Sequence, residues 1–82
     1  MAERKGRTIR RRAQIGSSIE IARTEAGLSR ETCARRVGVS YHTWWRWEQG
    51  RGSVPAELLP EVAKLLATSV EALISVRRRA AA

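Results

Sequence analysis

The side chains best able to make specific polar contacts lie in one short stretch of the sequence. At helical spacing they fall on one flank: Tyr41, His42, Trp45, Arg46 and Gln49. These groups donate or accept hydrogen bonds, but no nucleophile stands with a base and no carboxylate is expected beside His42. We therefore expect a binding surface and not an enzyme.

The other flank of the same helix is predicted to hold the fold. Trp44, Trp47 and Glu48 are three and four residues apart, which is the spacing of a core-facing stripe. We expect the two indole rings to be buried against apolar residues of other helices, namely Ile19, Ala22, Ala34 and Leu66. The alternative, in which these rings stack on a ligand, is the weaker interpretation because the spacing is that of a core.

Capping residues and glycines divide residues 28–50 into two short helices. Ser29 and Ser40 each offer a hydroxyl to the free N–H groups at a helix start. Gly38 supplies a turn with positive φ between the helices, and Gly50 ends the second one. The sequence predicts helices over residues 30–36 and 41–49, at a spacing that DNA-binding proteins use.

Apolar residues at helical spacing predict helices on both sides of this pair. Ile15 and its successors favour a helix over residues 13–26, and Gly27 supplies its end. A second segment is rich in leucine, and its helix should begin near residues 58–60, because Pro60 is tolerated only in a first turn.

A final helix is predicted over residues 70–76. Thr68 or Ser69 caps it, and Val70, Leu73 and Ile74 should face inward. Because no strand pattern is visible, we predict an all-α fold, a compact bundle of five helices.

Length and composition limit the classes of protein that fit. A chain of 82 residues makes one small domain, and it has neither an apolar run of the ~20 residues that span a membrane nor a signal peptide. With one cysteine and one histidine we expect no disulfide, no metal and no cofactor, in a cytoplasmic protein. Cys33 is predicted to be a small apolar core residue, and a reactive thiol is the alternative.

Most of the net charge of +8 lies at the two ends of the sequence. Six basic residues against one acid give the first twelve residues a charge of +5: Arg4, Lys5, Arg7, Arg10, Arg11 and Arg12. Residues 77–79 add +3, and residues 13–76 are neutral. We predict a flexible basic arm over residues 1–12, a folded domain over 13–76 and a basic, alanine-rich tail over 77–82. Such tails attract phosphates, and the alternative is that they only solubilise or address the protein.

Residues 14–74 resemble the phage repressor and Cro type of helix-turn-helix domain, also called XRE-like. The matching segments are Arg23, LSxxxxAxxxGVS at 28–40, WxxWEQG at 44–50, LPEVAKLL at 59–66 and SVEALI at 69–74. The resemblance implies a bundle of the lambda-repressor type, in which the helix over 41–49 enters the DNA major groove. It also implies an ion pair between Arg23 and Glu48 that ties this helix to the first one.

The resemblance also implies which residues contact DNA. Tyr41, His42 and Arg46 are the expected base contacts, and guanidinium forks suit guanine. The expected phosphate contacts lie around that helix and in the arm: Arg30, Ser40, Thr43, Arg51, Gly52, Ser53, Arg10, Arg11 and Arg12.

The chain departs from the family pattern at three places. Cys33 stands where leucine is usual, and the loop over residues 50–60 is about one residue longer. Trp45 stands where the family has a polar residue. Either its indole contacts DNA, which we favour and assign as a fourth base contact, or it packs on a neighbouring helix.

Two functions are compatible with this pattern. The first is a transcriptional regulator, a repressor that binds an inverted repeat as a homodimer, with its dimer surface near residues 73–76. The second is an antitoxin-like or docking module that uses the same face to bind a protein, since aromatic residues and arginine are common in protein interfaces.

Overall fold

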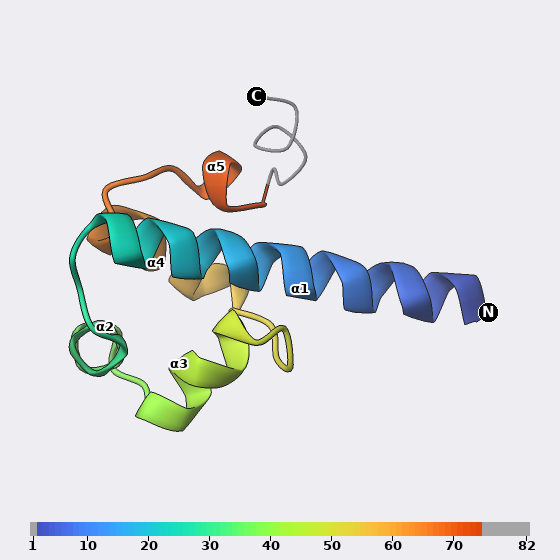
Figure 1. Ribbon diagram of the computed structural model, residues 1–82, viewed down its shortest axis with the longest axis horizontal. Coiled ribbons are helices and arrows are strands. Elements are labelled where there is room, and N and C mark those ends of the chain that lie inside the picture. Colours follow the sequence, from blue (N-terminus) through green and yellow to red (C-terminus); the bar gives the residue numbers. More distant parts are fainter. Residues whose placement is uncertain (1, 75–82) are drawn as a thin grey trace.

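The computed structural model describes residues 2–74, with side chains from Arg10 onward. It contains α1 (Ala2–Glu25), α2 (Arg30–Val37), α3 (Tyr41–Glu48), α4 (Leu59–Leu65) and α5 (Val70–Ile74), and a 3-10 turn, η1 (Ala56–Leu58), leads into α4. In Figure 1, α1 forms the long axis, with α2 and α3 below it and α5 above it. No strand occurs within residues 2–74, and the predicted all-α fold of five helices is confirmed.

The core draws on every α-helix. The five largest fully buried side chains come one from each helix, in the order Ile19, Cys33, Trp44, Val62 and Leu73. Burial of Cys33 confirms its prediction as a core residue, and Trp44 and Trp47 are 0% and 5% exposed, as the stripe predicted. A bundle this small therefore depends on each helix contributing at least one side chain to a shared centre.

Local capping sets the predicted helix starts. The Ser29 hydroxyl accepts a hydrogen bond from the Thr32 amide at 3.1 Å, and the Ser40 hydroxyl accepts one from the Thr43 amide at 3.0 Å. Gly38 ends α2 with a φ of +89°. Of the two candidates before α5, Ser69 is the one that bonds an amide of that helix, at 3.0 Å.

The prediction of an irregular N-terminal arm is wrong in one respect, since α1 begins at Ala2 and not near residue 13. Arginine, lysine, glutamate and alanine favour helix, and no proline interrupts this segment, so the first helix continues outward. At 1.5 Å per residue a helix of this length measures about 36 Å. The first turns of α1 extend beyond the other helices as a rod (Figure 1).

The prediction for α5 is wrong at its end. Leu73 is 1% exposed and belongs to the core, so it cannot form a dimer surface, whereas Ile74 is 46% exposed and faces inward only in part, at a hollow that Leu59 also lines. A helix of five residues presents only a narrow stripe to the bundle, and successive residues turn by about 100°. The rest of the predicted dimer surface, residues 75–76, and the predicted tail, 77–82, lie outside the described residues.

For a metal site and a membrane span, the structure bears on the described residues alone. Between residues 2 and 74, no helix is long and apolar enough to cross a bilayer. In the same part of the chain, no three metal-ligating side chains form a group.

Candidate nucleic-acid interface

Helix α3 has a buried side and an open side, as predicted. Trp44, Trp47 and Glu48 are buried in the bundle. On the opposite side Tyr41 is 49% exposed, and His42 and Arg46 are exposed as well. The predicted base contacts are therefore accessible to a partner, and their contact with bases stays a prediction.

An unusually close approach of α1 fixes the far end of α3. A Cβ atom on Gly16 would lie 2.6 Å from the Glu48 carbonyl oxygen and still nearer to that of Trp47. The next turn repeats this contact, because a Cβ on Gly50 would lie 2.7 Å from the Cα of Ala13. Only glycine allows the two backbones to meet this closely.

The buried carboxylate of Glu48 joins three parts of the bundle. Its Oε2 accepts hydrogen bonds from Arg23 Nε at 2.6 Å and from Trp44 Nε1 at 2.7 Å, and its side chain is fully buried. Arg23 also donates to the Leu28 carbonyl at 2.8 Å, in the turn between α1 and α2. The predicted ion pair between Arg23 and Glu48 is confirmed, and it holds α3 against α1.

Arg30 completes this network, which the sequence did not predict. Its Nε donates to Glu48 Oε1 at 2.7 Å, and one of its terminal nitrogens lies 3.5 Å from Glu20. The Glu48 carboxylate, and after it the Tyr41 phenol, raise the pKa of Arg30 above its ordinary value. Arg30 was expected to bind phosphate, but part of its guanidinium already serves Glu48, and only its remaining N–H groups are open to a phosphate.

Two further predicted phosphate contacts lie at the start of α3. The Ser40 hydroxyl donates to the Thr43 hydroxyl oxygen at 2.9 Å while it caps the helix. This bond uses the Ser40 proton and leaves the Thr43 proton free to point outward. Of the two, Thr43 is the better placed donor for an anion.

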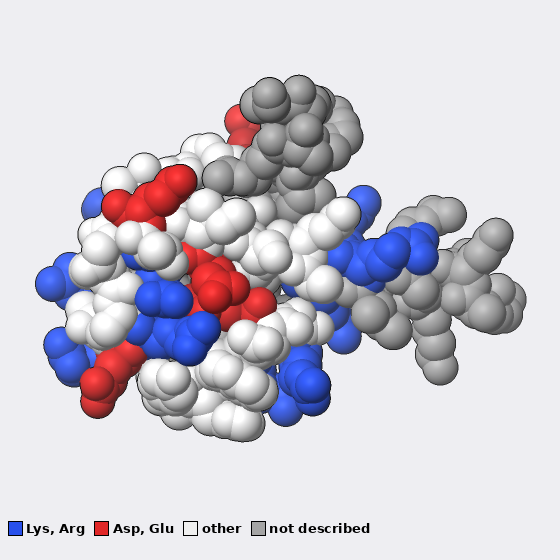
Figure 2. All heavy atoms as spheres, in the orientation of Figure 1, with Lys and Arg blue, Asp and Glu red and all other residues white. Residues whose placement is uncertain are grey.

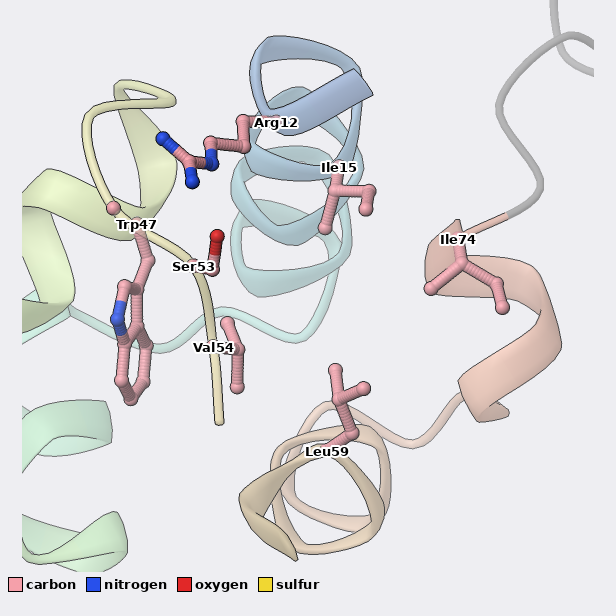
Figure 3. A pocket seen from close by; sticks show the side chains of 8 residues that line it. Arg12, Ile15, Trp47, Ser53, Val54, Leu59 and Ile74 are labelled. Atoms are coloured by element: carbon pink, nitrogen blue, oxygen red, sulfur yellow. The ribbon is translucent and has the colours of Figure 1, made fainter. Parts of the chain in front are cut away.

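The loop after α3 gathers predicted contacts from two elements. Arg46 donates to the Arg51 carbonyl at 2.9 Å, and its Nε would lie 3.7 Å from a Cβ on Gly52. From α1, Arg12 extends toward the loop above Ser53, at the edge of a hollow that Trp47 also lines (Figure 3). Arg46 therefore lies along the loop, and part of its hydrogen-bonding capacity is already used.

Trp45 lies against another aromatic ring of its own helix, and its assignment as a fourth base contact stays a prediction. Its ring stacks on His42 of the same helix, with centroids 5.6 Å apart and an interplanar angle of 20°. Trp45 is half-buried and His42 is exposed. The two rings form one outward unit, which the i and i+3 spacing permits but does not require.

Basic side chains also lie on the described part of α1 that faces solvent. Arg10, Arg11 and Arg12 are exposed. Figure 2 shows blue lysine and arginine atoms where α1 leaves the bundle, with no red acidic atoms among them. These cations therefore lie on α1 near the loop that follows α3, where they would attract an anionic partner.

The family of the chain follows from comparison with known proteins. A family model described as "Helix-turn-helix domain" matches residues 6–74, which includes α2 to α5 in full and α1 from residue 6 onward. The chain belongs to this family. The assignment agrees with the turn at Gly38 between α2 and α3, and it confirms the resemblance drawn from the motifs.

Similar proteins are described as regulators. The chain is 37% identical over 63 residues to an "uncharacterized transcriptional regulator in ATPase CF(0) region" of Rhodospirillum rubrum, and it spans 58% of that relative's length. The crystal structure of the clp gene regulator ClgR from Corynebacterium glutamicum matches with a TM-score of 0.72 and 30% identity, over 87% of this chain and 81% of that one.

A third match supports the fold alone. The crystal structure of the hypothetical transcription factor NHTF from Neisseria has a TM-score of 0.75 at 20% identity, over 85% of this chain and 80% of that one. Together the helix-turn-helix family and the similarity to regulators support DNA binding by this chain.

Proposed function

We propose that this helix-turn-helix protein is a transcription regulator that binds double-stranded DNA by inserting α3 into the major groove. The observation that carries the proposal is the two-sided character of α3. One side is fixed by Trp44, Trp47 and Glu48, and the other exposes Tyr41, His42 and Arg46. A rigid helix with open polar side chains is what base recognition in the major groove requires.

Each exposed side chain has a distinct expected role. Arg46 would fork its remaining N–H groups to a guanine, and His42 would donate to or accept from a base edge. A good contact of this kind discriminates between bases by about 1–3 kcal/mol. The expected phosphate contacts are loop residues 51–53, the open N–H groups of Arg30, the Thr43 hydroxyl, and Arg10, Arg11 and Arg12, and such contacts set the register without reading sequence.

We further propose a homodimer on an inverted repeat. One domain of this size covers too little of the groove for tight specific binding, whereas two α3 helices about 34 Å apart would fit successive turns of a duplex. The exposed Ile74 on α5 supports a contact between protomers near that helix. Occupation of a promoter by such a dimer would exclude other proteins, so repression is the proposed direction of control, in the cytoplasm.

Selection of bound duplexes from a random library tests this function. We expect enrichment of one motif with two-fold symmetry, and the mass of the purified complex should correspond to two chains on one duplex. Arg46→Ala should weaken the selected duplex more than random duplex, and Lys64→Ala, at an exposed position on α4, should weaken neither selectively. Without enrichment of any motif the proposal fails, and the protein-docking alternative becomes the better one.

A further inference from the structure

The stacked rings of His42 and Trp45 occupy the outer side of α3, and neither belongs to the side chains that form or pack against the core. Trp44 and Trp47 turn into the core, whereas Trp45 is half-buried and His42 is exposed. Among residues 10–74, neither ring of the pair has a hydrogen-bond partner. We propose that this pair is a stacked aromatic plate, and that the apolar indole of Trp45 in it binds the C5-methyl group of a thymine in the major groove. The inference rests on the proposed function, because it names the base feature that α3 recognises.

The chemistry of the groove selects this ligand. A base pair presents donors and acceptors in the major groove, and its only apolar group there is the thymine methyl. An indole face is a large apolar surface whose exposure to water is unfavourable. A methyl group laid on this surface removes apolar area from water on both partners.

Stacking prepares the plate before DNA binds. A centroid separation of 5.6 Å at 20° holds the two rings nearly parallel along one helix face. Each ring then limits the rotation of the other, so less side-chain freedom is lost on binding. A lone tryptophan at this position would have to be ordered by the DNA itself.

The charges around the plate favour an anionic duplex. The carboxylate of α3, Glu48, is fully buried and paired with Arg23 and Arg30, so it does not oppose phosphates on the outer side. Arg46 is drawn toward the Arg51 carbonyl, which leaves the rings open on their own side of the helix.

Replacing thymine by deoxyuridine in the selected duplex tests the inference. Deoxyuridine lacks the methyl group and keeps every hydrogen bond. At one thymine in one half-site we expect about a fourfold weaker Kd, which corresponds to roughly 0.8 kcal/mol for one buried methyl group at about 1.4 kcal/mol per factor of ten. A duplex that binds tightly and tolerates deoxyuridine at every thymine would overturn the inference and leave the proposed function intact.

Two variants assign the effect to the pair. Trp45→Ala should bind the thymine and deoxyuridine duplexes equally well, whereas Tyr41→Ala, on the same helix, should keep the fourfold difference. If Tyr41→Ala loses the difference in Kd between the two duplexes and Trp45→Ala keeps it, the methyl group contacts Tyr41 and the inference is wrong. If the library yields no preferred duplex, both the proposed function and this inference fail.

Fluorescence provides a readout that needs no base change. Trp45 is the most exposed of the three tryptophans, so acrylamide quenching reports mainly on its ring. Saturation with the selected duplex should reduce quenching of the native protein and leave that of Trp45→Phe unchanged. Quenching of the native protein that does not respond to the duplex would contradict the inference.

Discussion

Glu48 carries more of the interface geometry than any other single side chain. Its carboxylate accepts hydrogen bonds from Arg23, Arg30 and Trp44, so one residue connects α1, α2 and α3. Burial of a lone carboxylate is very unfavourable, but two guanidinium partners and an indole N–H satisfy its oxygens. The orientation of α3 therefore depends on a charge that never contacts a ligand.

Replacement of this carboxylate by an amide should destabilise the protein. Glu48→Gln leaves Arg23 without its carboxylate partner, leaves Arg30 with Glu20 alone at 3.5 Å, and turns an N–H group toward donors. We expect the free energy of unfolding in urea to fall by about 3 kcal/mol, at the lower end for a broken buried pair. Glu25→Gln, at an exposed position of α1, should change it by less than about 0.5 kcal/mol. Equal unfolding free energies of the two variants would show that the Glu48 carboxylate does not stabilise the bundle.

Cys33 makes stability depend on pH in the alkaline range. Burial raises the pKa of the Cys33 thiol, so the folded state keeps its proton where the unfolded chain, with an ordinary thiol pKa of about 8.5, loses it. The stability of the folded state therefore keeps its full value with respect to this thiol below about pH 8.5 and decreases as the pH rises above that value. The unfolding free energy of the native protein should therefore decrease more between pH 7 and pH 9.5 than that of Cys33→Ala. Parallel profiles would contradict the prediction.

At the scale of single residues, the sequence supported part of this site. The Arg23 and Glu48 pair followed from the family resemblance, and the burial of Cys33 from residue type. Neither Arg30 on Glu48 nor the stacking of Trp45 was predicted, because both depend on angles between side chains that a helical repeat does not contain. Arginines outnumber the one acidic residue expected to be buried, Glu48, and this excess in the sequence could have indicated that Arg30 is a second partner of Glu48.

At the scale of elements, the crossing of α1 and α3 decides how the outer side of α3 is presented. Gly16 and Gly50 bring the backbone of α1 against the last turn of α3. The starts of α2, α3 and α5 were predictable, because a serine hydroxyl and its amide partner are only three residues apart. The close crossing was not predicted, although a glycine inside an otherwise helical pattern indicates a close backbone approach.

A methyl group at this crossing should separate the two helices. Gly16→Ala gains about 1 kcal/mol of helix propensity, but its Cβ would meet two backbone carbonyl oxygens, neither of which can rotate away. We expect a net loss of about 2 kcal/mol in unfolding free energy, within the range for overpacked sites. The matched change Ser17→Ala, on the exposed side of α1, should leave stability unchanged or slightly higher. A Gly16→Ala variant more stable than the native protein would contradict the close crossing.

At the scale of the whole molecule, charge and shape act together. The net charge is +8, and the described residues at the outer end of the bundle include Arg10, Arg11 and Arg12 on α1. Composition predicted these cations but not their geometry, because a basic segment can be an irregular arm or a helix. As part of α1 they have a fixed direction relative to α3 and the loop over 51–53, where Arg12 already points (Figure 3).

A fixed row of cations should appear in the salt dependence of DNA binding. Each phosphate neutralised contributes about −0.9 to the slope of log K against log salt concentration. Changing Arg10, Arg11 and Arg12 together to glutamine should therefore make the slope less steep by up to about 3 for each bound protomer, or about 5 for the proposed dimer, and weaken random and selected duplexes alike. A triple change of Arg35, Arg36 and Lys64 removes the same charge elsewhere, since Arg36 and Lys64 line a different hollow, beside α2 and α4. If only nonspecific long-range attraction operates, both triple variants should flatten the slope equally. A larger effect of the α1 variant means that the rod meets the duplex backbone directly while α3 lies in the groove.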